Sequence, residues 1–227
     1  MLATGMPQRS VKLIPILAFL TALLLFVALS ASLDRVWLRA GDQRLLFLLS
    51  SQPGRMSTGF FGAITWLGSD YILGVVGLLG ALVLFRLRRT PELLGLLAVG
   101  VSTKVLEHGL KLIFHRARPE LLGATSGMFG DHAFPSGHSL NTAAIYGFIL
   151  ILVGANVSST FWKSVIVVTG VLLILVIGLS RVILKTHWPS DVVAGWLVAG
   201  MLLSVVFFVL TVLKGRFDVR ISSAKPG

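Results

Sequence analysis

Residues 164–191 read SVIVVTGVLLILVIGLSRVILKTHWPSD, and this stretch decides the fold. Its apolar run carries no charge before Arg181, and a membrane-spanning helix needs about 20 mainly apolar residues. The run is therefore predicted to cross a bilayer. Ionisable residues, among them His187 and Asp191, then stand just before a second apolar run. The chain thus places polar groups where two predicted spans meet.

The composition is that of an integral membrane protein. Of 227 residues, 55% are hydrophobic and 13% are charged, against about 25% charged in soluble domains, and the mean hydropathy is +0.90. The absence of cysteine excludes disulfides, thiolate nucleophiles and cysteine-bound metals. The net charge of +11 comes mainly from residues that flank apolar runs. It therefore indicates membrane orientation and an anionic headgroup site, and no nucleic-acid partner is expected.

Six apolar stretches are long enough to span, so the predicted fold class is an all-α polytopic membrane protein in which residues 1–227 form a single domain. The predicted spans are Leu13–Ala31, Gly68–Phe85, Leu93–Phe114, Ser139–Ala155, Ser164–Leu184 and Val192–Leu213. The first resembles a secretory signal, but its apolar region is longer than a usual signal core, and an uncleaved span is expected. The stretch Leu33–Leu49 mixes charges with Trp37 and leucines, which is typical of a helix lying in the outer interface.

The basic residues favour cytoplasmic termini. Cytoplasmic loops carry an excess of lysine and arginine, and the compact turn of Arg86, Arg88 and Arg89 and the basic carboxyl-terminal tail then both lie inside. Four arginines between residues 35 and 55 argue the other way. With six spans, all three polar clusters of the chain fall on the outer face. One miscounted span would separate them, so their agreement supports the span count.

The first polar cluster is Lys111 with Arg118-Pro119. Cations that snorkel at a helix end are the ordinary alternative. However, helical spacing places Lys104, Glu107, His108 and Lys111 on one face of the third span, and ionisable residues in a span usually turn inward. Lys104 and Glu107 are interpreted as a structural pair, His108 as a satisfied buried histidine, and Lys111 as a ligand for the substrate.

The second cluster is Pro135-Ser136-Gly137-His138, at a loop-to-helix junction. Ser136 or Ser139 can cap the fourth span, Gly137 lets the backbone approach a ligand, and the free amides of a helix start favour an anion. Taken alone, the cluster is better explained as a capped helix with an incidental histidine. The neighbouring Asp131 and His132 are assigned no role.

The third cluster, Ser180-Arg181 with His187 and Asp191, is the most specific signal. Pro189 suits the first turn of the next helix. If helical geometry extends back to His187, Asp191 reaches its ring, fixes the tautomer and leaves the other nitrogen free to attack. A histidine and an aspartate at this spacing can also bind a metal. No third soft ligand is near in the sequence and three cations stand where a metal would sit, so no metal is expected.

The three clusters, Lys-x6-Arg-Pro, Pro-Ser-Gly-His and Ser-Arg-x5-His-x3-Asp, match in order and spacing the signature motifs of the type 2 phosphatidic acid phosphatases over residues 111–191. The chain resembles this family, which shares its core with vanadium haloperoxidases and acid phosphatases. The resemblance implies a six-helix membrane enzyme that hydrolyses lipid phosphates without metal or other cofactor.

The resemblance also implies a role for each motif residue. The phosphoryl oxygens would be held by Lys111, Arg118 and Arg181, with help from the backbone near Ser136 and Gly137. His187 would form a phosphohistidine and Asp191 would orient it. His138 would protonate the leaving oxygen and then activate water.

The expected partners are a membrane lipid phosphate and the bilayer, with no obligate protein partner. A site at the outer interface of a bacterial inner-membrane enzyme, facing the periplasm, suits undecaprenyl pyrophosphate best. Phosphatidylglycerophosphate, phosphatidic acid and lipid A phosphates are the alternatives. A rival of another class is a non-catalytic protein that binds or transports lipid phosphates. Binding alone needs the cations but not His138, His187 and Asp191, which argues against this rival. A haloperoxidase is disfavoured because its chemistry needs no bilayer.

Overall fold

A computed structural model describes residues 8–51, 55–119 and 132–223, and the regular structure in these ranges is entirely helical. The helices are α1 (Gln8–Ser30), α2 (Val36–Ser50), α3 (Arg55–Trp66), α4 (Asp70–Arg86), α5 (Thr90–Phe114), α6 (Gly137–Asn156), α7 (Thr160–Ile183) and α8 (Pro189–Ser223). The predicted all-α class is confirmed.

Six segments of the described residues are long and apolar enough to cross a membrane, and the chain is an integral membrane protein. They are Leu13–Ser30, Gly59–Arg86, Thr90–Phe114, Gly137–Asn156, Thr160–Ile183 and Pro189–Leu213. Each overlaps one predicted span, so the predicted number of spans is confirmed. The second is longer than predicted because α3 leads into α4 through a short turn at residues 67–69. Helix α3 was not expected from the sequence.

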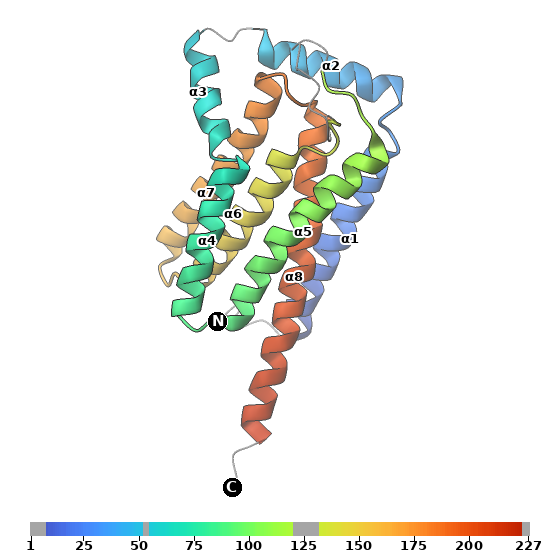
Figure 1. The fold of residues 1–227 in the computed structure, drawn as a ribbon. Coiled ribbons are helices and arrows are strands. Elements are labelled where there is room, and N and C mark those ends of the chain that lie inside the picture. The colour runs from blue at the N-terminus through green and yellow to red at the C-terminus, as the bar shows by residue number, and fades with distance from the viewer. Residues whose placement is uncertain (1–7, 52–54, 120–131, 224–227) are drawn as a thin grey trace.

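Helix α2 lies across one end of the bundle, over the ends of the long helices (Figure 1). It coincides with the helix predicted over Leu33–Leu49. Helix α1 begins and α8 ends at the opposite end of the bundle (Figure 1). The end of α5, the start of α6 and the junction of α7 with α8 all lie at the α2 end. The three polar clusters therefore gather at one end of the bundle, as the span count predicts.

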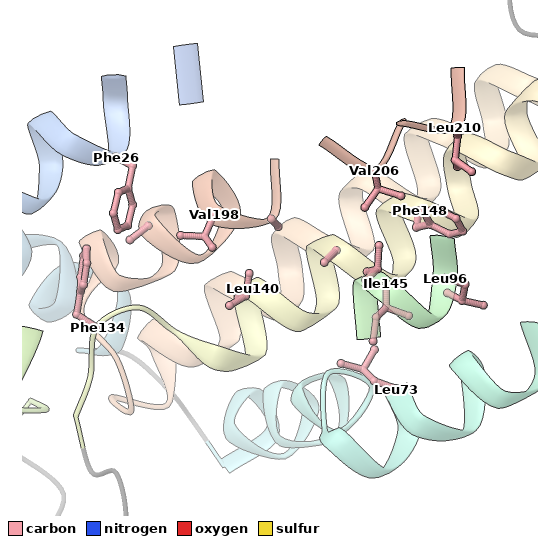
Figure 2. Close-up of a cluster of buried hydrophobic side chains, with 14 of the residues drawn as sticks. Phe26, Leu73, Leu96, Phe134, Leu140, Ile145, Phe148, Val198, Val206 and Leu210 are labelled. Atoms are coloured by element: carbon pink, nitrogen blue, oxygen red, sulfur yellow. The ribbon is translucent and has the colours of Figure 1, made fainter. Parts of the chain in front are cut away.

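The core joins α1, α4, α5, α6 and α8, and it begins beneath this end and continues along the bundle (Figure 2). The ring of Phe134 lies 5.8 Å from that of Phe26 on α1 and 4.8 Å from that of Phe114 on α5, measured between centroids. Leu140 on α6 and Val198 on α8 extend the same buried cluster toward the middle of the bundle. Many leucines and valines on the outer faces of the helices are exposed. Lipid tails are as apolar as these side chains, so a bilayer accommodates them.

Local sequence sets the helix ends that carry the clusters. The Ser136 hydroxyl caps α6 by accepting a hydrogen bond from the Ser139 amide, and Pro189 begins α8. Helix α5 ends at Phe114, and the C-cap residue His115 has a left-handed φ of 43°. The end of α5 and the starts of α6 and α8 therefore lie beside the ionisable residues of the three clusters.

Candidate active site

A tight turn between α7 and α8 brings His187 into the core. The carbonyl of Arg181 accepts hydrogen bonds from the amides of Thr186 and His187, at 3.0 and 3.2 Å. Lys185, just before Thr186, takes a left-handed φ of 57°. His187 is consequently only 3% exposed, and its Nδ1 donates to the carbonyl of Ala133 at 2.9 Å. A carbonyl oxygen can only accept, so Nδ1 carries the proton and Nε2 carries the lone pair.

Burial also sets the charge of His187. Loss of water lowers the pKa of His187 below its ordinary value of 6.5. The carboxylate of Asp191 opposes this shift, and the cations Arg181 and Arg118 add to it. His187 is therefore neutral near pH 7 and has a free lone pair on Nε2, which is the form that a nucleophilic imidazole requires.

Asp191 is fully buried, and groups other than His187 hold its two carboxylate oxygens. Oδ2 accepts the amide of Trp188 at 2.8 Å and lies 3.6 Å from Nδ1 of His187. Oδ1 accepts from Arg116 at 2.6 Å. The spacing of four residues does bring Asp191 beside the ring. Because α8 starts at Pro189 and does not include His187, a backbone carbonyl rather than Asp191 takes the short hydrogen bond.

Arg116 contacts the site in the structure, although the sequence analysis did not select it. Its guanidinium donates to Ser190 Oγ at 2.6 Å and to Asp42 Oδ2 on α2 at 2.7 Å, in addition to Asp191. Asp42 also accepts from the amide and the hydroxyl of Ser190, at 3.0 and 2.5 Å. The sequence could have indicated Arg116, because it lies two residues before the motif residue Arg118. Asp42 lies 74 residues earlier, and only the tertiary structure reveals its contacts.

Ser136 and Gly137 begin α6 in close contact with α8 and α5. The Ser136 amide donates to the backbone carbonyl of Asp191 at 2.9 Å, which links the second cluster to the third. A β-carbon built on Gly137 would lie 2.0 Å from Oε1 of Glu107. Position 137 therefore admits only glycine while Glu107 keeps its place.

Glu107 organises the polar face of α5. Its carboxylate accepts from Lys111 Nζ at 2.7 Å and from Asn141 Nδ2 on α6 at 3.0 Å. Lys104 lies 3.6 Å from Glu107 and makes a much shorter ion pair with Asp70 on α4. The predicted pair of Lys104 and Glu107 is present, but each of the two residues has a shorter ion pair with another partner. Lys111, the predicted substrate ligand, is the cation that Glu107 holds most closely.

Arg181 and Arg118 lie near the buried His187. They are within electrostatic range of each other, and both act on His187. Arg181 donates to the Thr65 hydroxyl on α3 at 2.9 Å, and its buried Nε has no hydrogen-bond partner in the part of the chain that the structure describes. Two like charges in a poorly solvated place repel each other, and an anion between them would remove the repulsion. This pair of guanidinium groups suits a phosphate.

His138 stands in the first turn of α6 and is half-buried. It lies within electrostatic range of Arg181 and His187, so the structure brings the two motif histidines into one site. Gly68, in the turn between α3 and α4, lets that turn approach closely. A β-carbon there would lie 3.3 Å from the His138 ring and 2.9 Å from Thr142 Oγ1.

The remaining histidines lie away from these contacts. The prediction that His108 is buried is wrong, because it is exposed on α5 with Nδ1 2.8 Å from the Lys104 carbonyl. A helix turns about 100° per residue, so His108 points outward when its neighbour Glu107 points into the bundle. His132 packs edge to face on His115, with 4.7 Å between ring centroids. Asp131 lies outside the described residues.

Residues 8–51, 55–119 and 132–223 contain no group of three histidine, aspartate, glutamate or cysteine side chains arranged to hold a metal ion. The guanidinium, ammonium and imidazole groups of the site lie beside the carboxylates of Glu107, Asp42 and Asp191, each of which pairs with a cation. The guanidinium and ammonium groups suit an anionic substrate.

Comparison with known proteins assigns the family. The family model described as the PAP2 superfamily matches residues 92–214. A curated relative, phosphatidylglycerophosphatase B of Bacillus subtilis, is 31% identical over 76% of this chain and 85% of its own length. An undecaprenyl-diphosphatase of Sulfolobus acidocaldarius is 34% identical over 30% of this chain and 28% of its own length.

A solved structure shares the fold. The crystal structure of a transmembrane PAP2 type phosphatidylglycerolphosphate phosphatase from Bacillus subtilis superposes with a TM-score of 0.72, at 24% identity. It covers 87% of this chain and 96% of that protein. The two proteins therefore share the fold. The chain belongs to the PAP2 superfamily and is a lipid phosphatase, not a non-catalytic binding protein.

Proposed function

We propose that this enzyme hydrolyses the terminal phosphate monoester of a phospholipid, with phosphatidylglycerophosphate as the first candidate. The observation that carries this proposal is the 31% identity to phosphatidylglycerophosphatase B over 76% of the chain. The similarity to an undecaprenyl-diphosphatase covers only 30% of the chain. The expected outward-facing site favoured undecaprenyl pyrophosphate, and the relatives support the reverse order. Undecaprenyl pyrophosphate is therefore the second candidate.

In the proposed mechanism Lys111, Arg118 and Arg181 bind the phosphoryl oxygens, and the backbone near Ser136 and Gly137 adds the amides of a helix start. Phosphoryl transfer depends mainly on positioning and on neutralising charge, which fixed cations can supply. The buried Nε of Arg181, which has no hydrogen-bond partner among the described residues, and the closeness of Arg181 to Arg118 support an anion site at this place.

The proposed nucleophile is Nε2 of His187. It attacks phosphorus, the bond between phosphorus and the lipid oxygen breaks, and His138 gives a proton to that oxygen. The lipid alcohol leaves and a phosphohistidine remains. His138 then takes a proton from water, the water oxygen attacks phosphorus, and the nitrogen–phosphorus bond breaks to release inorganic phosphate. The neutral His187 with its free lone pair supports the first step. The negative charge of Asp191 stabilises the ring while it is positive.

We propose in addition that residues 1–227 form one domain in the cytoplasmic membrane of a bacterium, with the α2 end outside and both termini inside. The core that runs through α1, α5, α6 and α8 supports a single domain. The arginines between α4 and α5 lie at the end opposite the site, which supports this orientation.

The test is a substrate panel with purified protein in mixed micelles that contain EDTA. The panel comprises phosphatidylglycerophosphate, phosphatidic acid, a lipid A phosphate and undecaprenyl pyrophosphate. We expect release of inorganic phosphate, with the highest kcat/KM on phosphatidylglycerophosphate. A higher kcat/KM on undecaprenyl pyrophosphate would reverse the order of the candidates. Turnover that EDTA abolishes and a divalent ion restores would refute the mechanism.

A further inference from the structure

We infer that Arg116 and Asp42 are positioning residues for the phosphatase reaction, although neither occupies a predicted motif position. The inference rests on the proposed roles of His187 and Asp191. It starts from the observation that Arg116 is the only side chain that donates a hydrogen bond to the carboxylate of Asp191 among the described residues. The other donor to that carboxylate is the backbone amide of Trp188.

Arg116 fixes the direction in which Asp191 presents its charge. Because Oδ1 is bound to Arg116 and Oδ2 to the Trp188 amide, the carboxylate plane cannot turn, and Oδ2 stays 3.6 Å from Nδ1 of His187. Asp191 is fully buried, so in the intact site the guanidinium of Arg116 shields the carboxylate from water. Without Arg116 the carboxylate loses its strongest partner and is free to rotate away from the ring.

Asp42 keeps Arg116 from cancelling the charge of Asp191. Arg116 lies between the two carboxylates, 2.7 Å from Asp42 and 2.6 Å from Asp191, and its side chain is 13% exposed. The three groups together carry one negative charge. The phosphohistidine retains the proton on Nδ1, so the ring becomes positive in the first step. The surplus negative charge lies beside it at that moment and favours the step.

Asp42 also connects α2 to α8, the helix that carries Asp191. It accepts from both the amide and the hydroxyl of Ser190, one residue before Asp191, and it is itself 3% exposed. The first turn of α8 is thereby fixed relative to α2. A cavity of about 720 Å³ between α1, α2 and the segment after α5 is lined by Asp42, Arg116 and Trp188. Small solutes can reach the Arg116 position from this side.

The experiment compares Arg116→Ala and Asp42→Asn with the wild type, using Arg39→Ala as the matched control. Arg39 is on α2, lines the same cavity, and pairs with the exposed Asp34 instead of with the site. We expect kcat to fall about 10–100-fold in both test variants, because small misplacements of reacting groups cost this much, while KM changes little. Formation of phosphohistidine from labelled lipid, quenched in alkaline SDS because the nitrogen–phosphorus bond is labile in acid, should slow by the same factor. Arg39→Ala should stay within about twofold of wild type.

Chemical rescue separates positioning from a structural role. Methylguanidinium should restore the kcat of Arg116→Ala at least about 10-fold in a saturable way, while methylammonium at the same ionic strength should not, because only the planar group bridges two carboxylates. Asp42→Asn keeps the shape of the side chain, so it decides the matter if Arg116→Ala does not fold.

The outcomes separate the inference from the proposed function. Wild-type kcat in Asp42→Asn or Arg116→Ala, or a loss without guanidinium rescue that raises KM as much as it lowers kcat, overturns the inference and leaves the phosphatase assignment intact. A wild-type protein that releases no phosphate from any lipid of the panel overturns both.

Discussion

The contact between Gly137 and Glu107 allows a sharp test of how the site is assembled. Gly137→Ala places a methyl group 2.0 Å from Oε1, 2.4 Å from Cδ and 2.8 Å from Oε2 of Glu107, where ordinary contacts between heavy atoms are about 3.5 Å or longer. The backbone at the start of α6 cannot yield easily, because the Ser136 amide is bound to the Asp191 carbonyl. The Glu107 carboxylate, at the end of a flexible side chain, must move instead.

The magnitude follows from the bonds that Glu107 would leave. It accepts from Lys111 at 2.7 Å and from Asn141 at 3.0 Å. Hydrogen bonds to charged groups contribute about 1.5–3 kcal/mol each, so loss of both should lower the free energy of unfolding by about 3–6 kcal/mol. Lys111 also loses the group that fixes its ammonium, so the KM for the lipid phosphate should rise.

The assay is unfolding by SDS in mixed micelles, with phosphate release measured in parallel. The control is Gly109→Ala on α5, where a β-carbon meets no atom within 4 Å, and which should change stability by no more than about 1 kcal/mol. Adding Glu107→Ala to Gly137→Ala should cost little more, because both changes remove the same bonds. A Gly137→Ala protein as stable and as active as Gly109→Ala would refute this reasoning.

The proposed mechanism and orientation make three further predictions. His187→Ala should abolish turnover and phosphohistidine labelling while it leaves lipid binding nearly unchanged, because the cations remain; substantial residual turnover would place the nucleophile elsewhere. His138→Ala should slow lipid release in a single turnover about 10²–10⁴-fold for a phosphate monoester and much less for undecaprenyl pyrophosphate, whose phosphate leaving group is a weak base. Equal losses on both substrates would reject His138 as the acid. In the chain's cysteine-free background, Asp34→Cys should react with an impermeant thiol reagent on intact cells and Arg86→Cys should not. The opposite labelling pattern would invert the orientation.

The sequence was sufficient to predict the spans and the gathering of the motifs, because both depend on local composition. Hydropathy alone indicates where the chain crosses the membrane, and six crossings place three polar clusters at one end. Helix α3 was not predicted because Arg55–Trp66 is short and contains glycine, serine and threonine among its aromatic residues. The turn at Gly68 then joins it to the next helix as one long segment.

The contacts inside the site depend on packing and could not be predicted in the same way. The spacing of His187 and Asp191 correctly indicates neighbours, but it does not reveal that Ala133, from a different segment, takes the hydrogen bond. In the sequence, Asp42 is one of several charged residues in the amphipathic stretch Leu33–Leu49. Its burial follows only from the path of α2 across the end of the bundle, where it meets Arg116.

The partners of the cations explain how so basic a site remains stable before substrate arrives. Lys111 is bound to Glu107, and Arg116 lies between two carboxylates, so each of these cations has a compensating charge. The partner of Arg181 is a neutral hydroxyl, and part of its guanidinium is buried without a hydrogen bond among the described residues. A buried cation without a counterion is costly, and an arriving phosphoryl group lowers that cost. In the proposed mechanism, the electrostatic strain at Arg181 favours substrate over water, and the compensated cations hold the geometry that His187 needs.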